Sequence, residues 1–315
     1  VVARAQLPRT STIAVSPGLT IRGRVVPLDR VGCYVPGGRY PLPSSLLMSV
    51  VPARAAGVPE ILAVCPSPAP IVLAAALTAG VTRFFRLGGA HAIAALAYGT
   101  KTIPAVDKIV GPGNRYVAAA KDLVSADCAI DFHAGPSEIV VLSSSAPPSW
   151  VASDLIAQAE HDPDARAILV TTRRSYATAV AQEVAARLPH SGPAAGALYQ
   201  HGAIVVCRTG DEAVTLVNRI APEHVLCSDA GLAARITRAG TIFLGDRTVP
   251  AAGDYATGSN HVLPTAGAAR FRGGLSAADF VRVISVQQMT GPALAGLAPA
   301  ITRLARAEGL EAHAA

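Results

Sequence analysis

Short apolar runs alternate with longer segments of helical pattern over most of the chain. Six runs predict buried strands, at residues 61–65, 82–87, 106–110, 139–142, 167–171 and 203–207. The segments between them predict helices, at residues 71–79, 90–98, 116–124, 151–161 and 176–188. Because each helix is long enough to connect neighbouring parallel strands, the alternation favours an α/β fold built on parallel sheets.

Two stretches depart from this alternation. Residues 190–196 are rich in Pro, Gly and Ala and predict a surface loop. From about Leu275 the pattern becomes helical and stays so to the C-terminus. We therefore expect α/β units followed by a small helical arm.

Composition supports a globular protein. Of 315 residues, 51% are hydrophobic and 15% are charged, and the mean hydropathy of +0.39 favours buried strands and Ala-rich helices over disorder. This length is ordinary for about two domains. No apolar run reaches the roughly 18 residues of a membrane span. No signal peptide is evident in residues 1–17, so we expect a cytoplasmic location and no membrane partner.

The cysteines give no sign of a disulfide framework or a metal cluster. Five are scattered along the chain without a C-x-x-C pair, at Cys33, Cys65, Cys128, Cys207 and Cys227. Most lie beside apolar, strand-like residues. They are expected to be reduced thiols in the core.

The basic net charge does not predict nucleic-acid binding. The charge is +6 with an isoelectric point near 9.3, but the arginines are spread along the chain and aromatic residues make up only 4%. The milder consequence is attraction of anionic ligands such as a dinucleotide.

Three glycine turns stand before predicted helices, at residues 36–38, 88–90 and 111–114. Backbone amides at such turns can cradle phosphate. None of the turns is the G-x-G-x-x-G fingerprint of dinucleotide-binding folds, and each alone is better explained as a plain loop. Three turns on one side of an inferred sheet make ligand binding and plain loops equally good explanations.

Four separated segments carry the residues suited to chemistry. Gln158 and His161, three positions apart on a predicted helix, can aim both side chains off one face, which is half of a metal site. The other segments are residues 221–224, residues 253–255 with 260–261, and residues 308–313. Together they lead to the hypothesis of a zinc-dependent alcohol-oxidising enzyme.

Each segment also has an ordinary explanation. Gln158 and His161 could form a solvated helix edge. Glu223 and His224, in a turn-like segment, could serve as two proton-transfer groups or be a surface dipeptide. Asp254 lies in a Gly-Asp-Tyr turn that a backbone hydrogen bond would explain equally well. His313 stands two residues from the end of the chain.

Taken together, these segments resemble the histidinol dehydrogenase family closely and in order. The resemblance covers almost the whole chain. The motifs that carry it are residues 31–38, 43–48, 88–90, 94–100, 106–114, 134–138, 158–161, 221–224, 253–255, 260–265 and 308–313.

The resemblance implies a role for individual residues. Gln158, His161, Asp254 and His313 match the family's zinc ligands, a mixed nitrogen and oxygen set that leaves positions open for substrate. The remaining matches are Glu223 and His224 to the catalytic pair, Ser137 and Glu308 to substrate-binding residues, and Tyr34 and Asn114 to NAD contacts. His224 and the four zinc-ligand matches are also expected to contact substrate.

The implied reaction is oxidation of L-histidinol to L-histidine through the aldehyde, with one zinc ion per site and two NAD. His224 would take the hydroxyl proton, and Glu223 would activate the water that attacks the aldehyde. Two alternatives stay open: a dehydrogenase of the same fold that acts on another amino alcohol or diol, and a catalytically silent truncated homologue.

The chain departs from the family pattern at a few positions. His91 stands where the family usually has a glutamine that contacts NAD, so His91 is the expected contact here. Phe132-His133 replaces Met-Pro, and Ala266 replaces a tyrosine. Family members also carry a long segment before the part that matches Val1, so we expect a short, N-terminally truncated member.

The expected architecture has two incomplete Rossmann-like domains. Residues 1–31 would be the remnant of the first domain's N-terminal part, 32–136 a Rossmann-like domain with the NAD-contacting turns, 137–274 a second one with the zinc and catalytic residues, and 275–315 a helical C-terminal arm. The resemblance further implies a homodimer in which each arm completes the other subunit's zinc site.

Overall fold

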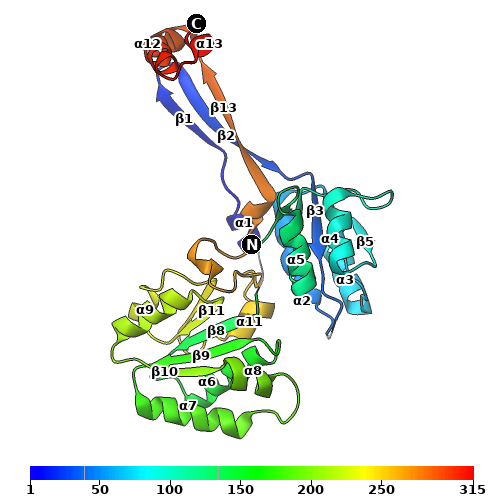
Figure 1. Cartoon of the computed structure of the whole chain (residues 1–315), viewed down its shortest axis with the longest axis vertical. Coiled ribbons are helices and arrows are strands. Elements are labelled where there is room, and N and C mark those ends of the chain that lie inside the picture. Colours follow the sequence, from blue (N-terminus) through cyan, green and yellow to red (C-terminus); the bar gives the residue numbers. More distant parts are fainter. Residues whose placement is uncertain (39, 133–134) are drawn as a thin grey trace.

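A computed structural model describes residues 1–38, 40–132 and 135–315 (Figure 1). His133, one of the departures from the family pattern, and Ala134, the first residue of the 134–138 motif, lie outside the described residues. The described strands form two five-stranded parallel sheets and one three-stranded antiparallel sheet. The expected α/β fold with parallel sheets is confirmed.

The first parallel sheet has the order β5-β4-β3-β6-β7. Its strands are β3 (Arg30–Tyr34), β4 (Glu60–Val64), β5 (Arg83–Phe85), β6 (Lys108–Val110) and β7 (Ala129–Ile130). Its helices are α2 (Pro43–Ala56), α3 (Pro70–Ala79), α4 (Gly89–Tyr98) and α5 (Arg115–Val124). Alternate residues of β4 enter separate apolar cores: Ile61 packs with α2 and α3, and Leu62 packs with α4 and α5. Helices therefore cover both faces.

The second parallel sheet has the order β10-β9-β8-β11-β12. Its strands are β8 (Glu138–Leu142), β9 (Arg166–Thr171), β10 (Ala203–Val206), β11 (His224–Cys227) and β12 (Thr241–Leu244). Its helices are α6 (Pro148–Ala159), α7 (Arg174–Arg187), α8 (Ala194–His201), α9 (Gly210–Ile220), α10 (Ala230–Ala233) and α11 (Pro250–Tyr255). Here too the apolar residues alternate, since Val141 packs with α6 and α7 and Val140 with α9.

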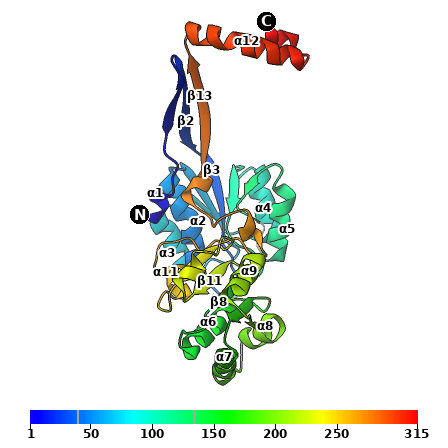
Figure 2. The ribbon, with the colours of Figure 1, turned by 90° about the vertical axis from the view of Figure 1, so that its left-hand side faces the viewer.

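The two ends of the chain meet in a third, antiparallel sheet of order β1-β2-β13. Strands β1 (Ser11–Ser16), β2 (Leu19–Pro27) and β13 (Val281–Met289) carry α12 (Gly291–Ala307) and α13 (Glu311–Ala314) at their far end. Short helices α1 (Val2–Ala5), η1 (Ala268–Arg270) and η2 (Ala277–Phe280) complete the element order. We call this antiparallel sheet with α12 and α13 the arm. Figures 1 and 2 show it projecting away from both parallel sheets.

Some expectations about single segments are wrong. Residues 281–289, expected to be helical, form β13, so the C-terminal segment is helical only from Gly291. Strand β13 pairs with β2 along its whole length, which holds it extended. The expected loop at residues 190–196 is cut short because α8 begins at Ala194.

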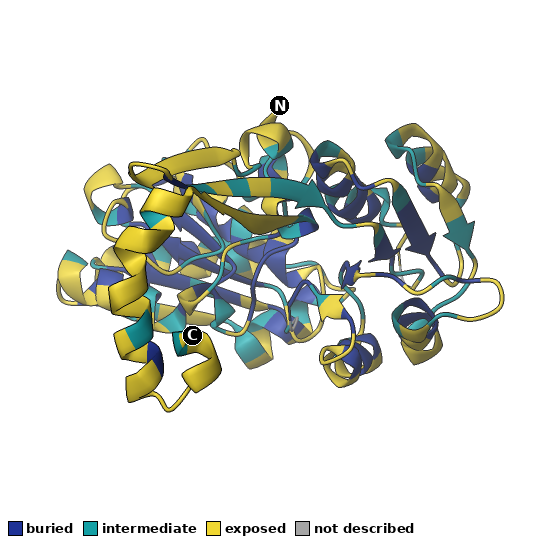
Figure 3. Cartoon of the chain, turned by 90° about the horizontal axis from the view of Figure 1, so that it is seen from above, coloured by how far each residue is buried: buried dark blue, intermediate teal, exposed yellow. Residues whose placement is uncertain are grey.

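The strands of the parallel sheets are largely buried, whereas the arm is largely exposed (Figure 3). All residues of β8 and β11 are buried, whereas every residue of β1 is exposed. The five cysteines are free and buried, as expected of core thiols. Among the described residues, no helix has the length and apolarity needed to cross a bilayer.

Candidate active site

A cavity of about 240 Å³ lies where the two parallel sheets meet. From the first sheet it is lined by residues that follow the strands, Pro112 after β6 and Phe132 after β7. From the second it is lined by Ser137 just before β8 and His224 at the start of β11. The carboxyl edge of one sheet thus faces the amino edge of the other across the cavity. Open α/β sheets hold ligands at the first kind of edge.

Glu223 is fixed at this junction by the local fold. Helix α9 ends at Ile220, and Ala221 turns the chain with the positive φ of 50° that non-glycine residues seldom adopt. Parallel pairing with β12 then holds the backbone, since Thr241 N donates to Glu223 O at 2.9 Å. Behind it, a Cβ on Gly240 would stand 2.5 Å from that same oxygen, so only glycine fits.

The Glu223 carboxyl group takes part in a short hydrogen-bond chain. Its Oε2 accepts from Ser137 Oγ at 2.5 Å and from Glu138 N at 2.9 Å. Ser137 Oγ in turn accepts from Gln158 Nε2 at 2.7 Å. Burial raises the pKa of Glu223 to about 8, although the bonds from Ser137 and Glu138 act in the opposite direction. The carboxyl group is therefore oriented, and its protonation midpoint lies about one pH unit above neutral.

His224 begins β11 and is buried beside Glu223. Its Nδ1 lies 3.7 Å from Glu223 Oε2 and has no hydrogen-bond partner among the described residues. Its ring packs against Phe243, with centroids 5.7 Å apart. Burial, and then the imidazoles of His161 and His261, lower the pKa of His224 to about 4. The imidazole is therefore neutral near pH 7 and can accept a proton.

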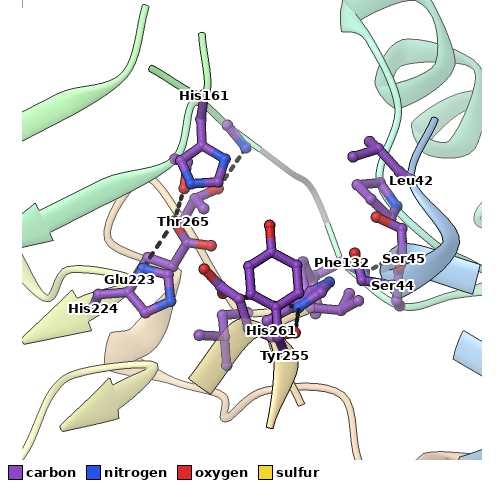
Figure 4. A pocket seen from close by; sticks show the side chains of 17 residues that line it. Leu42, Ser44, Ser45, Phe132, His161, Glu223, His224, Tyr255, His261 and Thr265 are labelled. Carbon is purple, nitrogen blue, oxygen red and sulfur yellow. Dashed lines mark hydrogen bonds and ion pairs between the residues drawn. The ribbon is translucent and has the colours of Figure 1, made fainter. Parts of the chain in front are cut away.

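A second polar group lines the cavity at the end of α11. His261 Nδ1 is 3.1 Å from the backbone oxygen of Asp254 and 3.8 Å from its Oδ1. Burial raises the pKa of Asp254, and the nearby His261 and His161 oppose that shift. His161, two residues beyond α6, lines the same cavity. Figure 4 shows His161, Glu223 and His224 on one side, with His261 and Tyr255 beside them.

Two expectations about local structure at the site are wrong. His224 does not lie in a turn but starts a buried strand, because β11 pairs with β8 and β12 on both sides. Asp254 does not lie in a turn but in α11, which Pro250 initiates.

The four residues that match zinc ligands are not all brought together in one chain. His161 and Asp254 line the cavity, and Gln158 reaches it through Ser137. His313 lies in α13 at the far end of the arm, and Glu308 caps α12 there (Figure 1). In the described part of the chain, no three His, Cys, Asp or Glu side chains form a group able to hold a metal.

The residues that match NAD contacts lie at the carboxyl edge of the first sheet. Tyr34 ends β3, and its hydroxyl oxygen accepts from Gly89 N at 3.1 Å. His91 lies in the first turn of α4 and is exposed. Asn114 caps α5, with Oδ1 accepting from Tyr116 N and Val117 N at 3.1 Å each. Because the cap uses the oxygen, a ligand would meet the Asn114 amide nitrogen.

Further residues line the cavity to which the sequence assigned no role, namely Leu42, Ser44, Ser45, Asp131, Phe132, Tyr255, His261 and Thr265. Asp131 directly follows β7 at the carboxyl edge of a parallel sheet, but that two-residue strand leaves almost no periodic signal in the sequence. His261 and Thr265 stand within the 260–265 motif, and Thr265 Oγ1 accepts from Gly135 N at 2.5 Å. Ser44 and Ser45, at the start of α2, stand within the 43–48 motif.

Comparison with known proteins gives a consistent result. A family model described as histidinol dehydrogenase matches residues 1–315. Histidinol dehydrogenase from Cereibacter sphaeroides is 49% identical over 98% of this chain and 74% of that protein. The one from Geobacter sulfurreducens is 49% identical over 94% of this chain and 72% of its own. The crystal structure of histidinol dehydrogenase from Elizabethkingia anophelis superposes with a TM-score of 0.95 at 36% identity, over 99% of this chain and 75% of that chain.

Proposed function

The chain belongs to the histidinol dehydrogenase family of oxidoreductases, and from this premise we propose that it oxidises L-histidinol to L-histidine through the aldehyde, with two NAD as hydride acceptors. The observation that carries the proposal is the buried Glu223–His224 pair, which opens onto a cavity between the two parallel sheets. A neutral imidazole beside a carboxyl group of raised pKa supplies the two proton-transfer groups that such a reaction needs.

His224 is proposed as the base for oxidation of the alcohol. Its lowered pKa keeps the imidazole neutral, so a ring nitrogen can take the hydroxyl proton while hydride leaves the carbinol carbon. Glu223 is proposed as the base for hydration of the aldehyde. Its Oε2 is held by Ser137 and Glu138, which fixes the orientation of the carboxylate toward an attacking water. The hydrate then loses the second hydride.

The residues near the cavity are suited to a zinc ion. His161 would supply an imidazole nitrogen and Asp254 a carboxylate. Gln158 would supply its amide oxygen, because its amide nitrogen already donates a hydrogen bond to Ser137 Oγ. These donors suit a borderline cation, but a stable site needs another ligand. His313 is the proposed fourth ligand. When bound, zinc would orient the substrate's imidazole and amine and polarise its hydroxyl group.

The NAD site is proposed at the carboxyl edge of the first sheet. Tyr34, His91 and Asn114 lie at the ends of strands or the starts of helices there, where free backbone amides favour a pyrophosphate. NAD accepts the hydride in each oxidation step. In this placement, NAD at the carboxyl edge of the first sheet lies opposite Glu223 and His224, with the cavity between them.

A homodimer with exchanged arms is proposed because Glu308, at the C-terminus of α12, and His313, in α13, lie at the end of the arm that is remote from both parallel sheets (Figure 1). Helix α12 also exposes an apolar stripe at helical spacing, made of Leu294, Leu297, Ile301 and Leu304. A second copy that buries this stripe would bring the end of the arm to the partner's cavity. Such an interface is isologous and twofold.

The test is formation of NADH by the zinc-loaded protein. L-histidinol, L-histidinal and an amino alcohol without an imidazole would be supplied separately. The proposal expects two NADH per histidinol, one per histidinal and far slower turnover of the third compound. Comparable rates with the third compound would support the alternative of another amino-alcohol substrate. Absence of NADH with all three, in protein proven to hold zinc, would support a catalytically silent homologue.

A further inference from the structure

A buried ion pair lies directly behind the glycine turn at residues 111–114. Lys121, on α5, and Asp131, which follows β7, are 3% and 2% exposed. Lys121 Nζ contacts Asp131 Oδ1. The side chain of Lys121 extends toward the N-terminus of its own helix, as helical side chains do, and so points back to the turn that precedes the helix.

Both peptide groups of Gly111 are bound by this pair. Gly111 N donates to Asp131 Oδ2 at 2.8 Å, and Gly111 O accepts from Lys121 Nζ at 3.1 Å. Buried peptide groups in a loop need such partners, because no strand ladder provides them. The first residue of the turn is therefore held by two opposite charges, the Asp131 carboxylate at its N–H and the Lys121 ammonium at its C=O.

Gly111 lies close against the backbone of β3 and leaves no room for a side chain. Its φ of +109° is a conformation that glycine adopts readily. A Cβ at this position would lie 2.2 Å from the backbone oxygen of Tyr34. A displacement of Gly111 would therefore shift the backbone of Tyr34, which it contacts, and also Asn114, which follows three residues later in the same turn.

Asp131 also joins the turn to the cavity wall. Its Oδ1 accepts from Phe132 N at 2.7 Å, and its backbone oxygen accepts from Arg272 Nη1. The Arg272 guanidinium carbon stands 4.7 Å from the centre of the Phe132 ring. Phe132 lines the cavity, so the same carboxylate supports the turn and one side of the site.

We propose that Lys121 and Asp131 are positioning residues for NAD, which hold the Gly111 turn so that Tyr34 and Asn114 face the cofactor together. The inference rests on the proposed NAD site and deepens it. Neither side chain touches the cofactor: both act through the backbone of Gly111. The opposing explanation is that the pair serves folding alone.

Two double variants separate these explanations. Lys121→Met/Asp131→Leu replaces the pair by apolar side chains, a change that buried ion pairs often tolerate because no lone charge remains. It removes both anchors of Gly111. Lys121→Gln/Asp131→Asn removes the charges but keeps an amide donor and an amide acceptor for Gly111. Lys108→Met is the matched control, because Lys108 is also a buried lysine, 3.7 Å from Asp279, but its hydrogen bond goes to Asp279 O and not to the turn.

The measurements are the Kd for NADH, from its fluorescence on binding, and the KM for L-histidinol in the zinc-loaded enzyme, with melting temperatures alongside. We expect the apolar double variant to bind NADH about tenfold or more weakly, since small misplacements of binding groups have effects of that order. Its KM for histidinol should change much less. The amide double variant and Lys108→Met should stay within about threefold of wild type in NADH binding.

Equal NADH binding by wild type and the apolar double variant would overturn the inference and leave the proposed function intact. Loss of binding in the amide variant as large as in the apolar variant would also overturn it, since the hydrogen bonds to Gly111 would then be irrelevant. Wild-type protein that binds no NADH, or binds it equally after Asn114→Ala, would contradict the proposed NAD site and the inference with it.

Discussion

The cavity and the arm hold their polar residues in opposite ways. Glu223 and His224 are each 6% exposed, and neighbouring strands and hydrogen bonds fix their orientation. In α12, which is described throughout, Ala305 alone is buried, and His313 lies beyond it on a helix of four residues. The proposed acid–base pair is thus oriented within one folded chain. The roles proposed for Glu308 and His313 require a surface of a second chain.

The cavity and the arm differ first in how deeply their polar residues are buried, and this burial determines their chemical properties. Burial shifts the pKa of Glu223 and of His224 in opposite directions, so their environment prepares them for proton transfer without a ligand. His313, by contrast, is exposed on a helix of four residues at the end of the arm. Variants on the two sides should therefore fail differently: those in the cavity in the rate of chemistry, and those in the arm in assembly and metal binding.

The largest effect is expected from His224→Asn. Removing a general base of this kind lowers kcat by about 10²–10⁴-fold, while the arm and its assembly should be unaffected. The measurement is steady-state NADH formation with L-histidinol, with sedimentation as the check on assembly. A variant that keeps kcat within a few fold of wild type would show that His224 is not the base.

Glu223→Gln should separate the two oxidation steps. If the carboxylate activates water only for aldehyde hydration, oxidation of L-histidinal supplied directly should fall by about 10²-fold, and hydride release from the alcohol by less. Single-turnover NADH formation from each substrate measures the two steps. Equal losses with both substrates would remove the proposed division between Glu223 and His224.

The fold could be predicted from the sequence wherever burial of one face produces a periodic pattern of hydrophobic and polar residues. Strands such as β8 and β9 are buried runs, and the helices between them follow at the length of a crossover. Strand β13 could not be predicted in this way. Eight of its nine residues are exposed, so no alternation of burial marks it, and its partner β2 is more than 250 residues away.

Prediction of the site residues was limited in the same way, by contacts that distant segments make. Glu223 and His224 were found through a family motif, but neither the burial of the two side chains nor the strand that begins at His224 was visible in a short Pro-Glu-His segment. Asp131 was missed because a two-residue strand gives almost no periodic signal before it. What the sequence lacked in each case was the neighbour supplied by a distant part of the chain.

Zinc content tests the boundary between cavity and arm. His161→Ala should lower zinc per chain well below that of wild type, since His161 contributes a nitrogen within the cavity. His313→Ala should do the same only if the arm completes the site. Metal analysis after dialysis, with His190→Ala as a surface control, gives the answer. Full zinc content in His161→Ala would contradict the assigned ligand set.

Complementation tests the exchange of arms directly. A His224→Ala chain is mixed with a His313→Ala chain, both inactive alone. In an exchanged heterodimer one of the two sites has both residues intact, so a statistical mixture should recover about a quarter of wild-type activity. Differently tagged chains prove that the heterodimer is present. No recovery in proven heterodimer would mean that each chain builds its own site.

The smallest effect concerns stability and pH at Glu223. Burial raises the pKa of Glu223 from an ordinary 4.5 to about 8, so between these pH values the folded chain keeps a proton that the unfolded chain has lost. Raising the pH through this window therefore destabilises the wild type, by at most about 1.4 kcal/mol per pH unit. His224 has the opposite sign: its pKa falls from 6.5 to about 4, so stability is lost as the pH falls through that range.

Glu223→Gln isolates the first of these contributions, because glutamine does not titrate and its amide oxygen can still accept from Ser137 and Glu138. The His224 contribution is present in both proteins and cancels from their difference. In metal-free protein, the melting temperature of the variant relative to wild type should therefore rise by a few degrees between about pH 4.5 and pH 8. Thermal melts at four or five pH values measure this. A difference that does not change with pH would mean that Glu223 ionises in the folded chain as it does in the unfolded one. Burial in the cavity would then not shift the pKa of Glu223, and the comparison between cavity and arm would lose its electrostatic part.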